Sequence, residues 1–377
     1  MTSTLVREGE RIMVICNACR YCEGYCAVFP AMERRTAFSA GDLHLLANLC
    51  HNCGECLYAC QYAPPHEFGV NVPRILAQLR LESYEAYAWP PPLAGAFRRH
   101  SVATSVGLAA AMSLVLLASA RATGSLQPPA AEADFYQVLP HGVMIALFGG
   151  VFAFALVALG VGLARFWRDS RRPGPSGSGG SAGPRLADEP RRGTRPTYSA
   201  IRDALTLRNL HAHGADCTYA GEEMRTAWRR RLHHCTFYGF ALCFASTSVA
   251  ALYHWLGFLA PYDYASLPVL LGTVGGLGLV VGPAGLYWIG RQRDVDLTDP
   301  AQQPADRGFI VLLLLTSLTG LVLLALRSTP AMPMLLIVHL GIVLALFVTL
   351  PYGKFVHGLY RAAALVRDAR EGAEGTE

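Results

Sequence analysis

C-N-A-C-R-Y-C-E-G-Y-C, residues 16–26, shares its cysteine spacing with C-H-N-C-G-E-C-L-Y-A-C, residues 50–60. Each run reads C-x2-C-x2-C-x3-C, and the second follows the first at an offset of about 34 residues. Eight of the eleven cysteines in the chain lie in these two runs. The spacing is typical of bacterial ferredoxins that hold two iron–sulfur clusters. The runs therefore predict that the first ~70 residues form a ferredoxin-like domain that transfers single electrons.

The ligands of each cluster follow from the same spacing. A cubane cluster needs four thiolates, and in two-cluster ferredoxins the fourth cysteine of each run binds the other cluster. We therefore predict two [4Fe–4S] clusters with crossed ligation. The first set is Cys16, Cys19, Cys22 and Cys60, and the second set is Cys50, Cys53, Cys56 and Cys26.

Zinc and disulfides are the alternatives for these cysteines. Zinc sites of four cysteines normally use two separated C-x2-C knuckles, in which Cys22 and Cys56 would be surplus. Disulfides need an oxidising compartment, and residues 1–15 contain charged side chains and no long apolar core of a signal peptide.

One feature departs from small soluble ferredoxins. They usually have proline directly after the fourth cysteine, whereas Ala27 and Gln61 follow here.

The rest of the chain is too apolar for an ordinary soluble protein. Of its 377 residues, 52% are hydrophobic and only 16% are charged. The apolar residues gather in six stretches, each near the roughly 20 residues that a helix needs to cross a bilayer. These stretches are 101–120, 141–165, 234–258, 266–290, 308–327 and 333–353. The predicted fold is a membrane all-α bundle of six transmembrane helices with an N-terminal ferredoxin-like two-cluster domain.

Small residues inside the stretches are expected to bring helices close together in lipid. They include Gly149, Gly150, Gly272, Gly275 and Gly276.

Basic residues predict the orientation of the protein in the membrane. Arginines gather between the second and third spans, among them Arg165, Arg168, Arg171, Arg172, Arg191, Arg192, Arg229, Arg230 and Arg231. By the positive-inside rule this loop, both termini and both clusters are cytoplasmic, in a bacterial inner membrane.

Histidine is almost the only ionisable side chain inside the spans, where polar groups are costly. Spans three and six cross in opposite directions, so His234 (or His233) is expected to meet His357 near the cytoplasmic face. The outer pair would combine His254 with His339, with His141 as a spare candidate. Such pairs are the axial ligands that b-type haems need, and interfacial histidines are the alternative. The candidate haem ligands are His234, His254, His339 and His357.

These features divide the chain into six segments. They are a ferredoxin-like two-cluster domain (1–70), a connecting helix (71–100), transmembrane helices 1–2 (101–165), a cytoplasmic loop with a flexible linker (166–232), transmembrane helices 3–6 with the candidate haem sites (233–360) and a cytoplasmic tail (361–377). The linker is predicted over residues 170–196, a low-complexity run rich in Gly, Ser and Pro.

The stretches I-C-N-A-C-R-Y-C-E-G-Y-C-A-V-F-P-A-M-E (15–33), L-C-H-N-C-G-E-C-L-Y-A-C-Q-Y-A-P-P-H-E-F (49–68) and H-H-C-T-F-Y-G-F (233–240) carry a resemblance. The chain resembles the tricarballylate utilization protein B family, also called the citrate-utilization B type. Its last span, H-L-G-I-V-L-A-L-F-V-T-L-P-Y-G-K-F-V-H, is similar to a haem-bearing helix of the nitrate reductase gamma subunit. In that helix two histidines at the same separation each bind a haem, and they map onto His339 and His357. The partner histidines of that subunit lie closer together than His234 and His254.

The resemblance implies a membrane electron carrier that reoxidises a soluble FAD-dependent tricarballylate dehydrogenase. It implies that electrons pass from that flavoprotein through both clusters and haem b to the quinone pool. No catalytic residue for the substrate is predicted, because the chain has neither a dinucleotide-binding nor a Walker A fingerprint. Lys354, Tyr352 and Tyr360 are candidate partners of a quinone carbonyl. Two other functions stay open, a quinol-oxidising module similar to heterodisulfide reductase and an iron–sulfur redox sensor.

Overall fold

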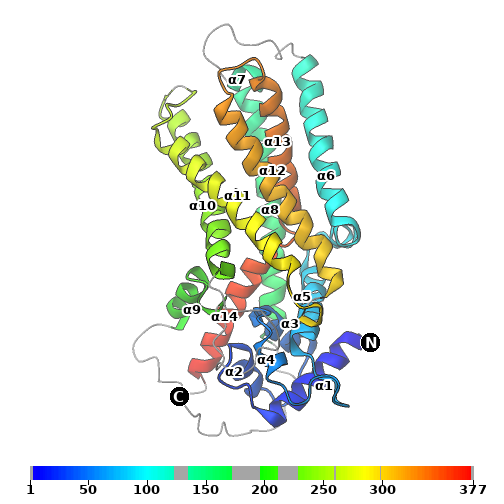
Figure 1. Cartoon of the computed structure of the whole chain (residues 1–377). Coiled ribbons are helices and arrows are strands. Elements are labelled where there is room, and N and C mark those ends of the chain that lie inside the picture. The colour runs from blue at the N-terminus through cyan, green and yellow to red at the C-terminus, as the bar shows by residue number, and fades with distance from the viewer. Residues whose placement is uncertain are drawn as a thin grey trace.

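The computed structural model describes residues 3–122, 135–171, 196–210, 228–258, 260–297 and 299–374. Every regular element within these residues is a helix. Figure 1 shows long helices packed side by side in the upper part and short helices gathered in the lower part, where both marked ends of the chain also lie. The predicted all-helical fold is confirmed.

The lower part begins with five helices that enclose the two cysteine runs. They are α1 (Thr4–Cys19), α2 (Val28–Glu33), α3 (Ala40–Leu49), α4 (Glu55–Tyr58) and α5 (Val72–Tyr87). Capping side chains determine where several of them start. Ser39 and Asp42 form a capping box at the start of α3, and the Asn71 side chain accepts a hydrogen bond from the N–H of Arg74 in α5.

The core of this part lies between α1, α3 and α5. Met13, Leu43, Leu46, Leu76 and Leu79 are fully buried and belong to one hydrophobic cluster. Helix α5, which falls in the predicted connecting segment, therefore buries one face together with the cysteine-bearing helices. Apolar burial of this kind is the main favourable term in folding.

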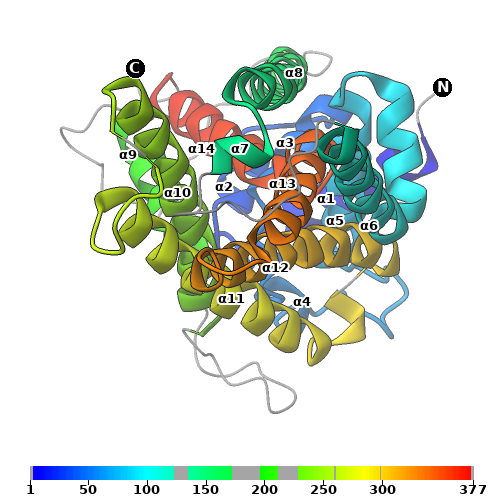
Figure 2. The same ribbon diagram turned by 90° about the horizontal axis from the view of Figure 1, so that it is seen from above.

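Among the described residues, six helices are long and apolar enough to cross a membrane, as predicted. Their spans are His100–Ala122 in α6 (Pro91–Ala122), α8 (His141–Asp169), α10 (Trp228–Trp255), α11 (Leu267–Arg291), Pro300–Ala325 with α12 (Gln303–Ala325), and α13 (Met332–Thr349). Shorter helices α7 (Phe135–Val138) and α9 (Pro196–Leu205) flank them. Helix α13 is the most buried of these spans and contacts α6, α8 and α12. Figure 2 shows it between α6 and α12.

Close packing by glycine is confirmed for some of the predicted positions and wrong for others. A Cβ on Gly275 would lie 2.8 Å from the backbone nitrogen of Cys243, so α10 and α11 meet there almost backbone to backbone. Gly272 and Gly276 also face neighbouring helices closely. In contrast, nothing lies within 4 Å of a Cβ built on Gly149 or Gly150. Those two glycines lie on an outward face of α8.

The last span is shorter than the sequence predicts. Helix α13 ends at Thr349, and α14 (Val356–Glu374) begins after a turn. Pro351 lies in this turn, and proline has no N–H to continue a helix. His339 and His357 are therefore on two different helices, not on one continuous helix.

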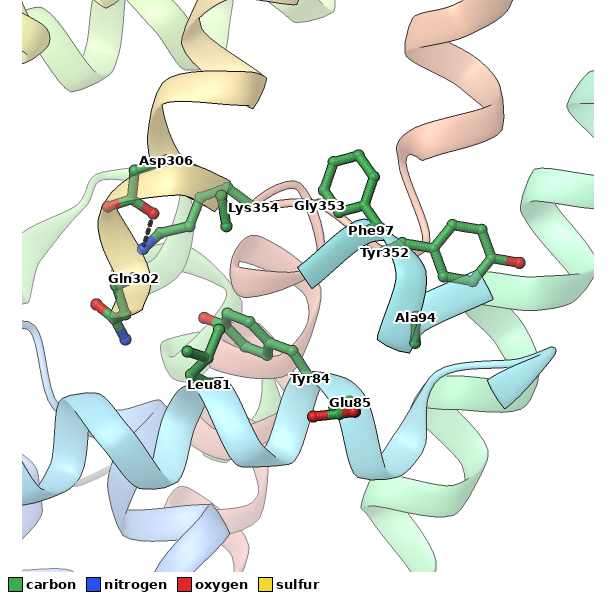
Figure 3. A pocket seen from close by; sticks show the side chains of 11 residues that line it. Leu81, Tyr84, Glu85, Ala94, Phe97, Gln302, Asp306, Tyr352, Gly353 and Lys354 are labelled. Atoms are coloured by element: carbon green, nitrogen blue, oxygen red, sulfur yellow. Dashed lines mark ion pairs between the residues drawn. The ribbon is translucent and has the colours of Figure 1, made fainter. Parts of the chain in front are cut away.

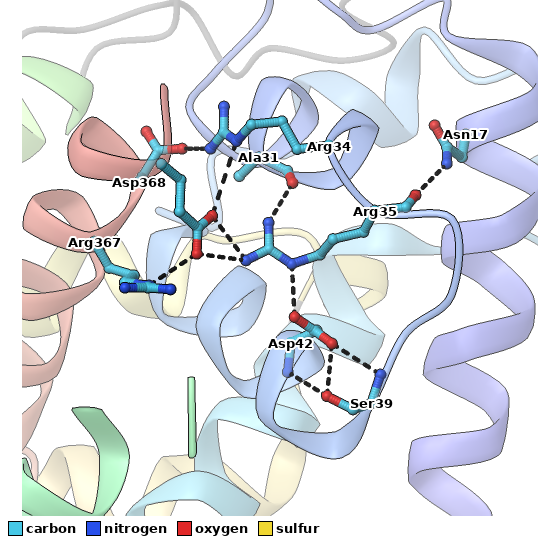
Figure 4. A network of polar contacts seen from close by, with 9 residues as sticks. Asn17, Ala31, Arg34, Arg35, Ser39, Asp42, Arg367 and Asp368 are labelled. Atoms are coloured by element: carbon cyan, nitrogen blue, oxygen red, sulfur yellow. Dashed lines mark hydrogen bonds and ion pairs between the residues drawn. The ribbon is translucent and has the colours of Figure 1, made fainter. Parts of the chain in front are cut away.

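Helix α14 attaches to the cysteine-bearing part through a buried ionic network (Figure 4). The Arg35 guanidinium lies 2.7 Å from Asp42 and 2.9 Å from Glu371, and Arg34 pairs with Asp368. Only 10% of the Arg35 side chain is exposed. Since removing one partner of a buried ion pair leaves an uncompensated charge, this network holds α14 in one position.

Candidate redox site

The structure arranges the eight cysteines of the two runs around two cavities. The first cavity is lined by Cys16, Cys19, Cys22, Cys60 and also Cys56. The second is lined by Cys26, Cys50, Cys53 and Cys56. Each cavity thus takes its fourth cysteine, Cys60 or Cys26, from the other run. Within the described residues no group of three His, Cys, Asp or Glu side chains is placed to hold a single metal ion.

Left-handed backbone conformations shape the cysteine loops. Helix α1 ends at Cys19, and Arg20 follows with a φ of 54°. Gly54 has a φ of 92° between Cys53 and α4, a conformation that glycine adopts without a steric penalty. These turns reverse the chain sharply, which brings cysteines only three positions apart to one cavity.

Burial disfavours ionisation of the Cys16 and Cys26 thiols, one in each set. Burial, followed by the charges of Cys60 and Cys22, raises the pKa of the Cys16 thiol to about 12. Burial, followed by Cys53 and Cys50, also raises the pKa of Cys26. Four clustered thiolates therefore need cations between them, and a coordinated metal deprotonates its thiol ligands outright. The donor set fits an iron–sulfur cluster in each cavity.

The two cavities differ in their exposure. Tyr21 borders the first cavity and is 66% exposed, so this cavity lies near the surface of the lower part. Cys50 of the second cavity is only 7% exposed. The second set therefore lies deeper, on the side that faces the long helices.

Arginines from the long helices hold the second run by its backbone. Arg229 of α10 donates to the carbonyl oxygens of His51 (2.9 Å) and Asn52 (3.2 Å). Arg361 of α14 donates to the carbonyl oxygen of Cys50 at 2.7 Å, and Arg293, just after α11, donates to that of Asn52. Burial lowers the pKa of Arg361 to about 10, so it keeps its positive charge at neutral pH. Three positive side chains thus surround the second run.

His233 and His357 face each other beside these arginines. Their ring centroids are 6.0 Å apart with planes at 89°. Imidazole nitrogens lie about 2 Å from a bound metal ion, which places the centroids of two axial rings about 6 Å apart. His233 Nδ1 is buried and has no hydrogen-bond partner among the described residues. His357 Nδ1 contacts the Lys354 carbonyl oxygen. A metal-binding imidazole is commonly oriented by such a hydrogen bond from its other ring nitrogen. This pair fits the axial ligands of one haem iron.

The other predicted histidines are placed differently. His234 Nε2 lies 3.2 Å from the Thr206 carbonyl oxygen, beyond the end of α9, so His233 and not His234 meets His357. His254 packs on His141 at a centroid distance of 4.0 Å, closer than two rings on opposite sides of an iron. His339 Nδ1 lies 3.0 Å from the Thr319 hydroxyl of α12. The structure does not bring His254 and His339 together.

Comparison with known proteins gives a consistent result over almost the whole chain. Residues 98–376 match the family described as Citrate utilization protein B, and residues 9–86 match the Fer4-like domain of that protein. The chain is 50% identical to Citrate utilization protein B of Escherichia coli over 372 residues, which cover 98% of this chain and 93% of the relative. This chain belongs to the citrate utilization protein B family. No solved structure matches it.

Membership of the citrate utilization protein B family confirms the resemblance found in the sequence. The Fer4-like match covers both cysteine runs and α5, which points to an iron–sulfur electron-transfer role. The match to the rest of the family covers the six apolar helices and α14. In this member of the citrate utilization protein B family, an iron–sulfur domain is therefore joined to a membrane-spanning part.

Several functional contacts were not predicted from the sequence. Arg229 was interpreted only as part of a positively charged loop, and Arg361 had no assigned role. The only sequence signal for Arg229 is its position four residues before His233, which is one helical turn. Residues 172–195 of the predicted linker, which include Arg191 and Arg192, lie outside the described residues.

Proposed function

We propose that this protein carries electrons from a soluble flavoprotein to a membrane quinone. The observation that carries the proposal is the connection between the second cysteine set and the membrane helices. Arg229 and Arg361 bind the second run, and the same two helices, α10 and α14, carry His233 and His357. A one-electron site in the lower part thus adjoins a candidate haem site at the ends of the spans.

The cofactors would be held by residues already described. Cys16, Cys19, Cys22 and Cys60 would bind one [4Fe–4S] cluster; Cys26, Cys50, Cys53 and Cys56 would bind the other. His233 and His357 would bind a b-type haem. When bound, each of these groups supplies a centre that takes up and releases one electron at a time.

The donor is proposed to be an FAD-dependent tricarballylate dehydrogenase, the partner that the family resemblance implies. The exposed rim of the first cavity, which includes Tyr21, supports this entry side. The positive side chains around the second run favour an added electron there, because positive charge stabilises the more negative, reduced state. This asymmetry supports flow from the first set to the second, toward the membrane, and disfavours the reverse flow of a quinol-oxidising module.

The test combines purified protein, the reduced flavoprotein and a quinone analogue. We expect quinol to form only when all three are present, and the reduced protein to show b-type haem bands. His233→Ala should abolish these bands, whereas the matched control His234→Ala should keep them. Failure to reduce quinone with the partner present would contradict the proposal. Haem bands that are absent after adequate haem supply would favour a redox sensor.

A further inference from the structure

A pocket lies where the lower part meets the starts of two membrane spans. It is formed by the last turns of α5, the first turns of α6 and α12, and the turn between α13 and α14 (Figure 3). Its lining residues include Leu81, Tyr84, Phe97, Asp306, Tyr352 and Lys354. Because α6 and α12 enter their spans here, the pocket is at the level of the membrane boundary.

Tyr84 presents an unused hydrogen-bonding group to this pocket. Its side chain is only 8% exposed, and its hydroxyl has no hydrogen-bond partner among the described residues. The hydroxyl points to the side of the pocket where Gln302 and Lys354 lie (Figure 3). A buried hydroxyl without a partner is costly, so an acceptor on a bound molecule would satisfy it.

The charges in the pocket favour a neutral ligand. Lys354 Nζ lies 2.7 Å from the Asp306 carboxylate, so its positive charge is already compensated. Glu85 also lines the pocket, which disfavours a phosphate or another anion. An ammonium group has three N–H donors, so Lys354 keeps donors for a ligand beyond its bond to Asp306. The aliphatic side chain of Leu81 and the ring of Phe97 line the pocket and suit an apolar ring of a ligand.

Lys354 also connects the pocket to the candidate haem site. Its carbonyl oxygen contacts His357 Nδ1, while its side chain reaches Asp306 in the pocket. A ligand in the pocket would therefore contact Lys354, whose carbonyl oxygen contacts His357 of the candidate haem pair. Tyr360, the third residue considered for this role, stacks on Phe166 and does not line the pocket.

We propose that this pocket binds the headgroup of a membrane quinone and is where the quinone is reduced. The proposal rests on the proposed function, which supplies the electrons from the flavoprotein. Tyr84 and Lys354 donate hydrogen bonds to a quinone carbonyl oxygen. Reduction adds two electrons and two protons, and both C=O bonds become C–OH. The protons come from water by way of Asp306, whose side chain is 41% exposed, and Lys354.

The test uses the purified holoprotein and its variants Tyr84→Phe and Lys354→Gln. Matched controls are Tyr253→Phe, at the far end of α10, and Arg307→Gln, on the exposed face of α12. Flavoprotein-driven reduction of a decyl-ubiquinone analogue is compared with reduction of ferricyanide, a soluble one-electron acceptor. We expect both pocket variants to lose at least tenfold in quinone reduction and to keep ferricyanide reduction. The controls should keep both.

A second measurement does not depend on turnover. An azido-quinone is photo-crosslinked to the unmodified protein, and the labelled peptides are identified by mass spectrometry. We expect label on residues 81–97 and 302–306, displaced by excess quinone. Label elsewhere, displacement by phospholipid, or normal quinone reduction in both pocket variants would overturn the pocket assignment. A wild-type protein that reduces ferricyanide but no quinone would instead overturn the acceptor in the proposed function.

Discussion

At the scale of single residues, Cys26 and Cys60 distinguish two ways of building the clusters. Each belongs to one run in the sequence and lines the cavity of the other run in space. A short loop can direct three closely spaced thiolates to one body, but the fourth has to come from elsewhere. The crossed arrangement ties the two runs together, because each cavity is lined by cysteines of both loops.

The predicted crossed ligation can be tested by spectroscopy. Cys60→Ser should remove the same EPR signal as Cys16→Ser, and Cys26→Ser the same signal as Cys50→Ser, each with the loss of about half of the iron. Cys243→Ser, in α10 where it packs against Gly275 of α11, is the control and should keep all of the iron. If Cys60→Ser removed the signal that Cys50→Ser removes, the clusters would be ligated within runs.

Arg361 makes a second prediction at this scale. Its guanidinium donates to the Cys50 carbonyl oxygen, so its charge lies beside the second cysteine set. Arg361→Gln should lower the reduction potential of that cluster by about 59 mV, a tenfold change in the one-electron equilibrium. Redox titration followed by EPR measures this potential.

Two variants control for other effects of the Arg361 substitution. Arg361→Lys keeps the charge and should restore most of the potential. Arg307→Gln removes a charge on the exposed face of α12 and should change nothing. An unchanged potential in Arg361→Gln would show that the arginine only docks the helix.

At the scale of helices, the contact between α10 and α11 depends on glycine. A Cβ on Gly282 would lie 2.6 Å from the backbone nitrogen of Thr236 and 2.8 Å from the carbonyl oxygen of Leu232. Lipid supplies no hydrophobic driving force between helices, so close backbone approach is what holds such a pair. Gly150 on α8 has no neighbour within 4 Å of its Cβ position.

These two glycines form a matched test of helix packing. Gly282→Ala should destabilise the protein by about 1–3 kcal/mol, because the added methyl group pushes two backbones apart. Gly150→Ala should be neutral or stabilising by up to about 1 kcal/mol, since alanine favours a helix. Thermal unfolding in detergent compares them. Equal effects of the two substitutions would contradict the packing of α10 on α11.

The break between α13 and α14 is the second feature at this scale. Pro351 and the turn around it separate His339 from His357, so the two do not share one helix axis. The hydrophobic pattern alone extends to residue 353, because lipid-compatible residues continue through the turn. The turn lets α14 leave the direction of the span and carry His357 to His233.

At the scale of the whole molecule, the cysteine-bearing part sits at one end of the six apolar helices (Figure 1). Two sets of contacts join the cysteine-bearing part to the long helices. They are the ion pairs of Arg35 with Asp42 and Glu371, and the hydrogen bonds from arginines to the second run. These contacts place α14 and both cysteine sets on the same side of the spans. The arginines of the segment between α8 and α10 favour the cytoplasm for that side.

The proposed orientation can be tested with epitope tags. A tag after residue 377 should be digested by protease only in inside-out membrane vesicles. A tag between α10 and α11, near Asp263, should be digested only in right-side-out vesicles or spheroplasts. The opposite pattern would place the clusters outside the cytoplasm and contradict the proposed flavoprotein partner.

The helical membrane fold and the grouping of the cysteines follow from local features of the sequence. Each span is specified locally, because every backbone polar group of a segment in lipid must be satisfied within its own helix. The cysteine spacing is likewise set by the chemistry of one small cluster. Neither depends on how distant parts of the chain meet.

Three further features depend on how distant segments pack: which histidines meet, which arginines surround the second run and where the pocket lies. Arg361 and Cys50 are separated by 311 positions, and His357 reaches His233 only because the chain turns at Pro351. Periodicity places such residues on a helix but does not select their partners. Partner choice depends on side-chain packing between elements, as the contact of His254 with His141 rather than His339 shows.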